Sequence, residues 1–118
     1  GNVDYERFYK DVIAPLQSGK EFEYKAFNCK NQKLEKTILV EPKKINIIEG
    51  VYSMHPTLID HYDLKIFLEI DSTRQSQRIL KRNGEQMHKK FMDLWIPLEN
   101  KYFEELKIKE KCDLVINV

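Results

Sequence analysis

Apolar residues recur at three- and four-residue spacing near the start of the chain. They are Tyr5, Phe8, Tyr9, Val12, Ile13 and Leu16. This spacing gives an α-helix one buried face. Asp4 stands where an N-cap accepts hydrogen bonds from unpaired backbone N–H groups, Pro15 disturbs the last turn, and Gly19 ends the helix. We therefore predict a helix between Asp4 and Gly19.

Alternating apolar and polar residues follow between Glu21 and Val40. Phe22, Tyr24 and Ala26 alternate with Glu23, Lys25 and Phe27, a polar patch covers residues 28–33, and Thr37-Ile38-Leu39-Val40 comes next. A period of two is typical of strands that expose one face. The pattern predicts two strands around a polar connection, as a hairpin or as an excursion from a larger sheet.

The next apolar run is short and rich in β-branched residues, and it reads Lys44-Ile45-Asn46-Ile47-Ile48-Glu49-Gly50. Such a run, bounded by Pro42 and Gly50, predicts a strand of a parallel sheet that is covered on both faces. Ligands of open α/β sheets bind at the carboxyl ends of the strands, where Glu49 would lie. The alternative is that Glu49 is an ordinary polar residue where a strand leaves the core.

Helical and strand patterns alternate over the rest of the chain. We predict a short helical stretch over 55–61, a strand over 63–71, a helix over 73–82, a second helix with a kink at Pro97, and a strand over 113–118. Asp71 or Ser72 is expected to cap the first of the long helices, and Asn83-Gly84 to end it. Strands alternating with helices predict an α/β fold with a parallel sheet.

Composition places the chain among ordinary globular domains. It has 118 residues, enough for one domain, with 42% apolar and 33% charged residues and a net charge of +1. This balance argues against a general nucleic-acid or membrane role, and no apolar run approaches the roughly 18 residues of a membrane span. Cys29 and Cys112 have no paired-ligand spacing, so we interpret them as reduced thiols of a cytoplasmic protein.

Positive charge is concentrated between Ser72 and Met92. This segment contains one acidic residue, Glu85, and six basic residues, which are Arg74, Arg78, Lys81, Arg82, Lys89 and Lys90. The three arginines are spaced by four and share a helix face, and guanidinium groups suit phosphate oxygens. This pattern favours an anion-binding helix, and together with Glu49 it outlines a metal-and-phosphate arrangement. The alternative is a solvated face whose charges pair with Glu99, Glu104 or Glu105.

Several stretches resemble the uridine kinase family, and in particular its bacterial uridine-kinase-like branch of the P-loop nucleoside kinases. The resemblance rests on Asn46-Ile47-Ile48-Glu49-Gly50-Val51-Tyr52-Ser53, on His61-Tyr62-Asp63 through Asp71, on Arg78-Ile79-Leu80-Lys81-Arg82, and on Trp95 through Phe103. It implies a Rossmann-like parallel sheet with flanking helices and a small β-hairpin excursion. It also implies transfer of the γ-phosphoryl group of ATP, with Mg²⁺, to the 5′-hydroxyl of uridine or cytidine.

The same resemblance implies roles for individual residues. Asp4 is similar to the family residue that binds the ribose hydroxyls, although helix capping also explains it. Phe27 and Asn28 stand where the family has Tyr-Asp against the nucleobase. Glu49 is similar to the carboxylate that helps to hold Mg²⁺. The basic residues Arg78, Lys81 and Arg82 fall in the segment that closes over the phosphates.

The chain lacks the family's phosphate loop, Gly-x-x-x-x-Gly-Lys-Ser/Thr. We therefore expect a single uridine-kinase-like domain without the first strand and helix of the family, and little kinase activity from this chain alone. The alternatives are a non-catalytic binding or homo-oligomerisation module whose exposed sheet edge pairs with another chain, and a phosphate-binding regulator that has lost catalysis.

Overall fold

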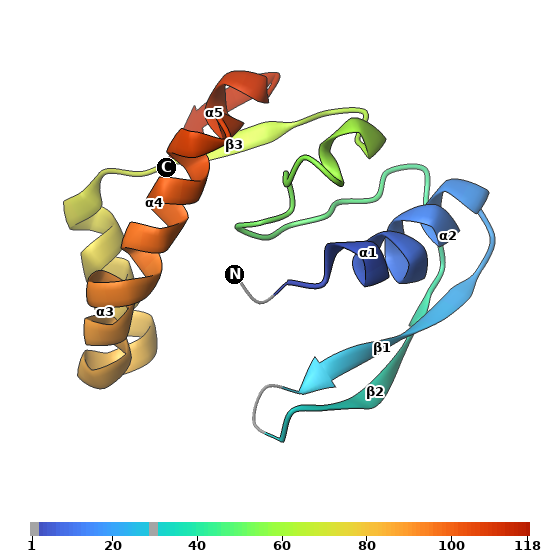
Figure 1. The fold of residues 1–118 in the computed structure, drawn as a ribbon, viewed down its shortest axis with the longest axis horizontal. Helices are drawn as coiled ribbons and strands as arrows, with labels where there is room; N and C mark the ends of the chain where they lie inside the picture. Colours follow the sequence, from blue (N-terminus) through green and yellow to red (C-terminus); the bar gives the residue numbers. More distant parts are fainter. Residues whose placement is uncertain (1–2, 29–30) are drawn as a thin grey trace. The chain divides into compact units, whose positions relative to one another are not determined.

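The computed structural model describes residues 3–28 and 31–118, which form two compact units (Figure 1). The first unit is Gly1–Ser53 and the second is Met54–Val118. Each unit contains helical segments and one two-stranded sheet within these described residues. This composition confirms a mixed α/β protein with helices and small sheets.

The first unit begins with a helical segment that follows the predicted bounds. It comprises α1 (Tyr5–Phe8), the π-helical turn η1 (Tyr9–Ile13) and α2 (Ala14–Ser18). The side chain of Asp4 accepts a hydrogen bond from the backbone N–H of Arg7, so Asp4 is the N-cap. Gly19 ends the segment with a φ of 73°, a left-handed conformation that glycine adopts at little cost.

Proline explains why both long helical segments contain a π-helical turn. Pro15 has no backbone N–H to donate, and its ring crowds the carbonyl four residues before it. Just before Pro15, the N–H of Ala14 reaches back five residues to the carbonyl of Tyr9, which widens the helix. The same arrangement precedes Pro97, where η3 (Phe91–Trp95) is the wide turn. The kink predicted at Pro97 therefore takes the form of a π-helical turn.

A β-hairpin completes the regular structure of the first unit. Strand β1 (Phe22–Asn28) pairs antiparallel with β2 (Lys33–Val40), with Phe22 opposite Val40 and Tyr24 opposite Ile38 (Figure 1). The alternation over 21–40 thus predicted both strands and their hairpin connection.

The predicted strand over Lys44–Gly50 is wrong. Residues 46–50 are irregular, and the side chains of Ile45 and Ile47 are 77% and 86% exposed. Asn46 accepts from the N–H of Lys43 at 2.9 Å and donates to its carbonyl at 3.0 Å, so local bonds engage the backbone there. No strand in the described part of the chain pairs with this segment, and a strand forms only where its backbone has such a partner.

The second unit has more elements, and apart from the short helix α5 they follow the order that the sequence pattern predicted. They are η2 (Ile59–His61), β3 (Ile66–Glu69), α3 (Ser72–Lys90), η3 (Phe91–Trp95), α4 (Ile96–Glu105), α5 (Ile108–Lys111) and β4 (Leu114–Asn117). Strands β3 and β4 are parallel, with Ile66 beside Leu114 and Leu68 beside Ile116. This pair is the part of the predicted parallel sheet that the described residues contain.

Helix α3 reverses at Gly84, as the Asn83-Gly84 signal predicted. Gly84 has a φ of 82° and a ψ of 174°, which is non-helical. The Oγ of Ser76, before the break, lies 2.7 Å from the Nε2 of His88, after it, although the two residues are twelve positions apart. This contact ties the two halves of α3 together. Asp71 caps the first half by accepting from the N–H of Arg74.

Apolar packing in the second unit involves most of its elements. Its buried side chains include Leu58, Ile59, Ile79, Ile96 and Ile108. Phe67 of β3 meets Phe103 of α4 edge to face, with ring centroids 5.1 Å apart.

Candidate functional site

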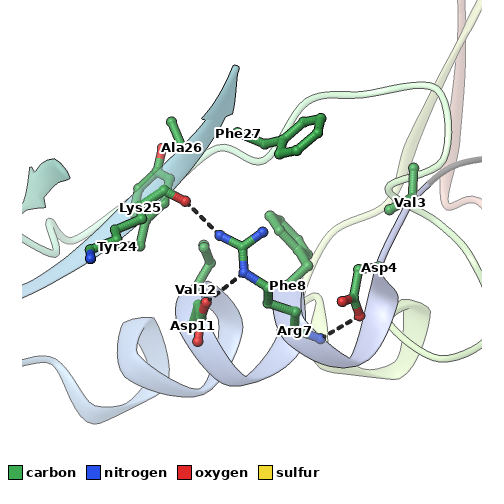
Figure 2. A pocket seen from close by; sticks show the side chains of 10 residues that line it. All are labelled: Val3, Asp4, Arg7, Phe8, Asp11, Val12, Tyr24, Lys25, Ala26 and Phe27. Carbon is green, nitrogen blue, oxygen red and sulfur yellow. Dashed lines mark hydrogen bonds and ion pairs between the residues drawn. The ribbon is translucent and has the colours of Figure 1, made fainter. Parts of the chain in front are cut away.

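The first unit contains a cavity of about 560 Å³ between its helical segment and β1 (Figure 2). Its lining consists of Val3, Asp4, Arg7, Phe8, Asp11, Val12, Tyr24, Lys25, Ala26 and Phe27. The volume falls in the range of small-molecule sites, and a mostly apolar lining with a few polar groups is typical of them. Two of the residues predicted to bind substrate, Asp4 and Phe27, therefore lie at one cavity.

Asp4 reaches the cavity because it begins the helical segment. Its Oδ1 accepts from the N–H of Arg7 at 3.0 Å, which satisfies one of the unpaired donors of the first turn. A carboxylate has two oxygens with several acceptor positions, so capping leaves acceptor capacity for a ligand. The capping role is observed, and it is compatible with binding of hydroxyl groups by the same side chain.

Arg7 holds the helical segment against the hairpin. Its Nη2 donates to the backbone carbonyl of Lys25 in β1 at 2.6 Å, and its Nε donates to the Oδ2 of Asp11 at 3.2 Å (Figure 2). The planar guanidinium can make both bonds at once because its donors form a fixed fork. Since the side chains of Arg7 and Asp11 are 35% and 37% exposed, water screens the ion pair and its stabilisation stays modest.

Phe27 lines the cavity near the end of β1, where the register of the hairpin shifts. Ala26 pairs with Lys36 whereas Phe27 pairs with Leu34, so one residue of β2 is skipped. The four consecutive β1 residues from Tyr24 to Phe27 all line the cavity, and the side chain of Phe27 is 49% exposed. The side chain of Asn28 lies outside the described part of the structure.

Glu49, the predicted metal ligand, belongs to the first unit but does not line this cavity. It is exposed and follows the irregular segment described above. Among the described residues, no group of three or more His, Cys, Asp or Glu side chains is placed to hold a metal ion. Glu49 on its own therefore offers a single carboxylate.

The basic residues of the predicted lid lie in the second unit, in the first half of α3. Arg78, Lys81 and Arg82 are all exposed. The Nε of Arg82 donates to the Oδ1 of Asn83 at 2.7 Å, and its guanidinium carbon lies 6.0 Å from the ring centroid of Phe91. The remaining arginine of this face, Arg74, donates to the carbonyl of Val118 at 2.8 Å and so has a structural role.

The alternative for this helix is a solvated face whose charges pair with Glu99, Glu104 or Glu105. Two ion pairs of the second unit bear on it. Arg74 pairs with Asp71 at 3.8 Å, and Glu105 pairs with Lys101 at 3.9 Å. Burial raises the pKa of the Glu99 carboxyl above its usual value.

Cys112 is a free thiol, and its Sγ donates to the carbonyl of Ile108 at 3.3 Å. Burial, together with the negative charge of Asp113, raises the pKa of this thiol. Cys29 lies outside the described residues. None of the described helices is both long enough and apolar enough to cross a membrane.

Comparison with known proteins identifies the family. The sequence profile of the Phosphoribulokinase / Uridine kinase family matches residues 1–91. The chain belongs to this family. The matched region includes the cavity, Glu49 and the basic residues of α3.

Individual members of the phosphoribulokinase/uridine kinase family support this assignment. A uridine kinase of Macrococcus caseolyticus is 28% identical over 113 residues, which cover 88% of this chain and 54% of the relative. Uridine kinases of Bacillus cytotoxicus and Bacillus mycoides are each 31% identical over 90 residues, which cover 70% of this chain and 42% of each relative. The chain spans about half the length of the curated relatives it matches.

Two polar residues of the cavity, Arg7 and Asp11, were not predicted as site residues. Their spacing of four on a predicted helix was a visible signal for an ion pair, because such residues are neighbours on the helix surface. The third partner, the carbonyl of Lys25, lies eighteen positions along the chain from Arg7 and carries no sequence signal.

Proposed function

We propose that this chain carries the acceptor-binding part of an ATP-dependent nucleoside kinase that transfers the γ-phosphoryl group to the 5′-hydroxyl of a uridine- or cytidine-type nucleoside. Membership of the family and uridine kinases among the relatives support the reaction class. A kinase of free nucleosides works where ATP is supplied, so we place this activity in the cytoplasm.

The observation that carries the proposal is the joint placement of Asp4 and Phe27 at one cavity. A carboxylate accepts hydrogen bonds from two neighbouring ribose hydroxyls, and an aromatic ring offers a face or edge to a planar base. A nucleoside offers a partner to each feature, because its sugar carries the hydroxyl groups and its base is planar. The cavity of about 560 Å³ is large enough for such a ligand.

In this proposal, Glu49 would contribute to the binding of Mg²⁺. A lone exposed carboxylate does not make a metal site, but Mg²⁺ is usually held by one or two carboxylates with substrate phosphates and waters. Glu49 would supply the carboxylate ligand of such a site, and the phosphate oxygens of ATP would supply other ligands. Mg²⁺, when bound, would neutralise charge that develops on the transferred phosphoryl group.

Arg78, Lys81 and Arg82 would provide the remaining positive charge. Their exposure on one half of α3 leaves them accessible to anions, and guanidinium groups bind phosphate oxygens in pairs. Stabilisation of the developing charge by such groups is a large part of catalysis in phosphoryl transfer.

ATP consumption tests the proposal. The 118-residue chain and a form extended upstream in its own gene would be assayed with Mg²⁺ and a panel of nucleosides, with Arg78→Ala in the extended form as a variant. We expect turnover from the extended form with a pyrimidine nucleoside, little from the short chain because it lacks the phosphate loop, and at least tenfold slower turnover from Arg78→Ala. If the extended form consumes no ATP with any nucleoside, the proposal is overturned.

A further inference from the structure

Arg7 lines the cavity, and its guanidinium is held by two partners. Two of its three nitrogens are engaged, Nε by Asp11 and Nη2 by the carbonyl of Lys25. Arginine has five N–H donors and no acceptor. Figure 2 shows the third nitrogen, Nη1, on the side of the guanidinium that faces the rings of Phe8 and Phe27. No hydrogen bond is recorded between Nη1 and the part of the chain that the structure describes.

We propose that Arg7 is a specificity-determining residue, whose Nη1 donates to the carbonyl oxygen at the 4-position of the bound base. This inference rests on the nucleoside site proposed above, because it takes the base to lie beside Phe27. An edge with a carbonyl oxygen, as in the 4-position of uracil, accepts such a bond. An amino group at the same position, as in cytosine, only donates and would face another donor.

The surroundings of Arg7 strengthen the discrimination. The carboxylate of Asp11 and the carbonyl of Lys25 both bind the guanidinium. A base edge beside Nη1 therefore meets a hydrogen-bond donor. Because both partners hold the guanidinium plane, Nη1 has little freedom to turn away from an unsuitable base, and a fixed donor discriminates better than a mobile one.

The order of groups along the helical segment is consistent with this arrangement. Asp4, proposed to bind the sugar, caps the first turn of the helical segment, and Arg7 belongs to that turn. Both residues line the cavity, so the sugar end and the base edge of one nucleoside would be bound from the start of the same helical segment.

Calorimetric titration of the 118-residue chain with uridine and with cytidine tests the proposal. We expect uridine to bind about tenfold more tightly, since a hydrogen bond from a charged donor has that effect or more. Arg7→Met should reduce the ratio of the two dissociation constants to near one. Lys10→Met, which removes an exposed cation of the same segment outside the cavity, should leave the ratio unchanged.

Arg7→Met also removes the bond to β1, so circular dichroism would be recorded for each variant. If Arg7→Met does not fold, Arg7→Lys serves in its place, because it keeps the charge and loses the planar fork; we expect a ratio between those of the other two proteins. A ratio within about threefold of one in the original chain, or an unchanged ratio in the Arg7 variant, would overturn the role of Arg7 and leave the nucleoside site standing. Failure of the folded original chain to bind either nucleoside would overturn both.

Discussion

Asp4 has one observed role, capping, and one proposed role, ligand binding, and substitutions can separate them. Its Oδ1 caps the helical segment by accepting from the N–H of Arg7 at 3.0 Å, and its carboxylate is proposed to bind ribose hydroxyls. Asn caps a helix about as well as Asp but carries no charge, whereas Ala cannot cap. Asp4→Asn therefore tests the ligand role with the cap retained, and Asp4→Ala removes both roles.

The magnitudes follow from the single capping bond. Loss of an N-cap costs about 1 kcal/mol, so Asp4→Ala should lower the free energy of unfolding by about that amount. Asp4→Asn should change it by less than about 0.5 kcal/mol. Replacing the charged acceptor of ribose hydroxyls by an amide should weaken uridine binding by about tenfold in Asp4→Asn, and loss of the acceptor in Asp4→Ala should weaken it by at least as much.

Urea unfolding and uridine titration of the same protein samples measure the two effects. Glu6→Gln is the matched control, because Glu6 is an exposed acid in the same first turn and does not line the cavity. It should leave uridine binding unchanged. Uridine binding by Asp4→Asn as tight as in the original chain would refute the ligand role. A loss of stability in Asp4→Asn as large as in Asp4→Ala would refute the separation of roles.

Three further predictions concern the second unit. Ser76→Ala removes the 2.7 Å contact with His88 that joins the halves of α3, so it should lower the free energy of unfolding in urea by about 1 kcal/mol. Gln77→Ala, beside it, should lower this free energy by less, and equal losses in the two variants would contradict the role of the contact. Gly84→Ala places a Cβ at a φ of 82° and should cost about 1–3 kcal/mol; an increase in helical circular dichroism without loss of stability would show instead that α3 can continue through the break. Because burial raises the pKa of Glu99 above 4.5, the folded state holds this proton more tightly than the unfolded state, so the contribution of Glu99 to stability falls as the pH rises from about 4.5 through the folded pKa. Glu99→Gln should flatten this part of the pH–stability curve, and an unchanged curve would argue against the shift.

Local sequence signals predicted the longer helices, several of their ends and the two strands of the hairpin. Asp4, Gly19, Asp71 and Gly84 act at the positions where caps and breaks were expected. Each signal works through backbone groups within a few residues, so the sequence alone contains the information. The parallel pairing of β3 with β4 also agreed with the predicted α/β pattern.

The strand predicted over Lys44–Gly50 is wrong because a local sequence pattern does not indicate which backbone a segment pairs with. Apolar β-branched residues indicate what a segment prefers when it is covered, but a strand needs a partner backbone, and partners are chosen over long distances. Asn46 instead bonds to the backbone of Lys43. For the same reason, the sequence indicated Asp4 and Phe27 separately through resemblance, whereas the clamp from Arg7 to the Lys25 carbonyl became visible only in the folded chain.

An NMR titration shows directly whether the cavity of the first unit binds uridine. Amide resonances of the 118-residue chain would be followed during titration with uridine, with free ribose and uracil as controls. We expect saturable shifts centred on Asp4, Arg7 and the Lys25–Phe27 stretch, and weaker shifts with either half of the nucleoside alone. Shifts confined to residues 54–118, or no shifts in the folded chain at millimolar uridine, would contradict the claim that this cavity binds a nucleoside.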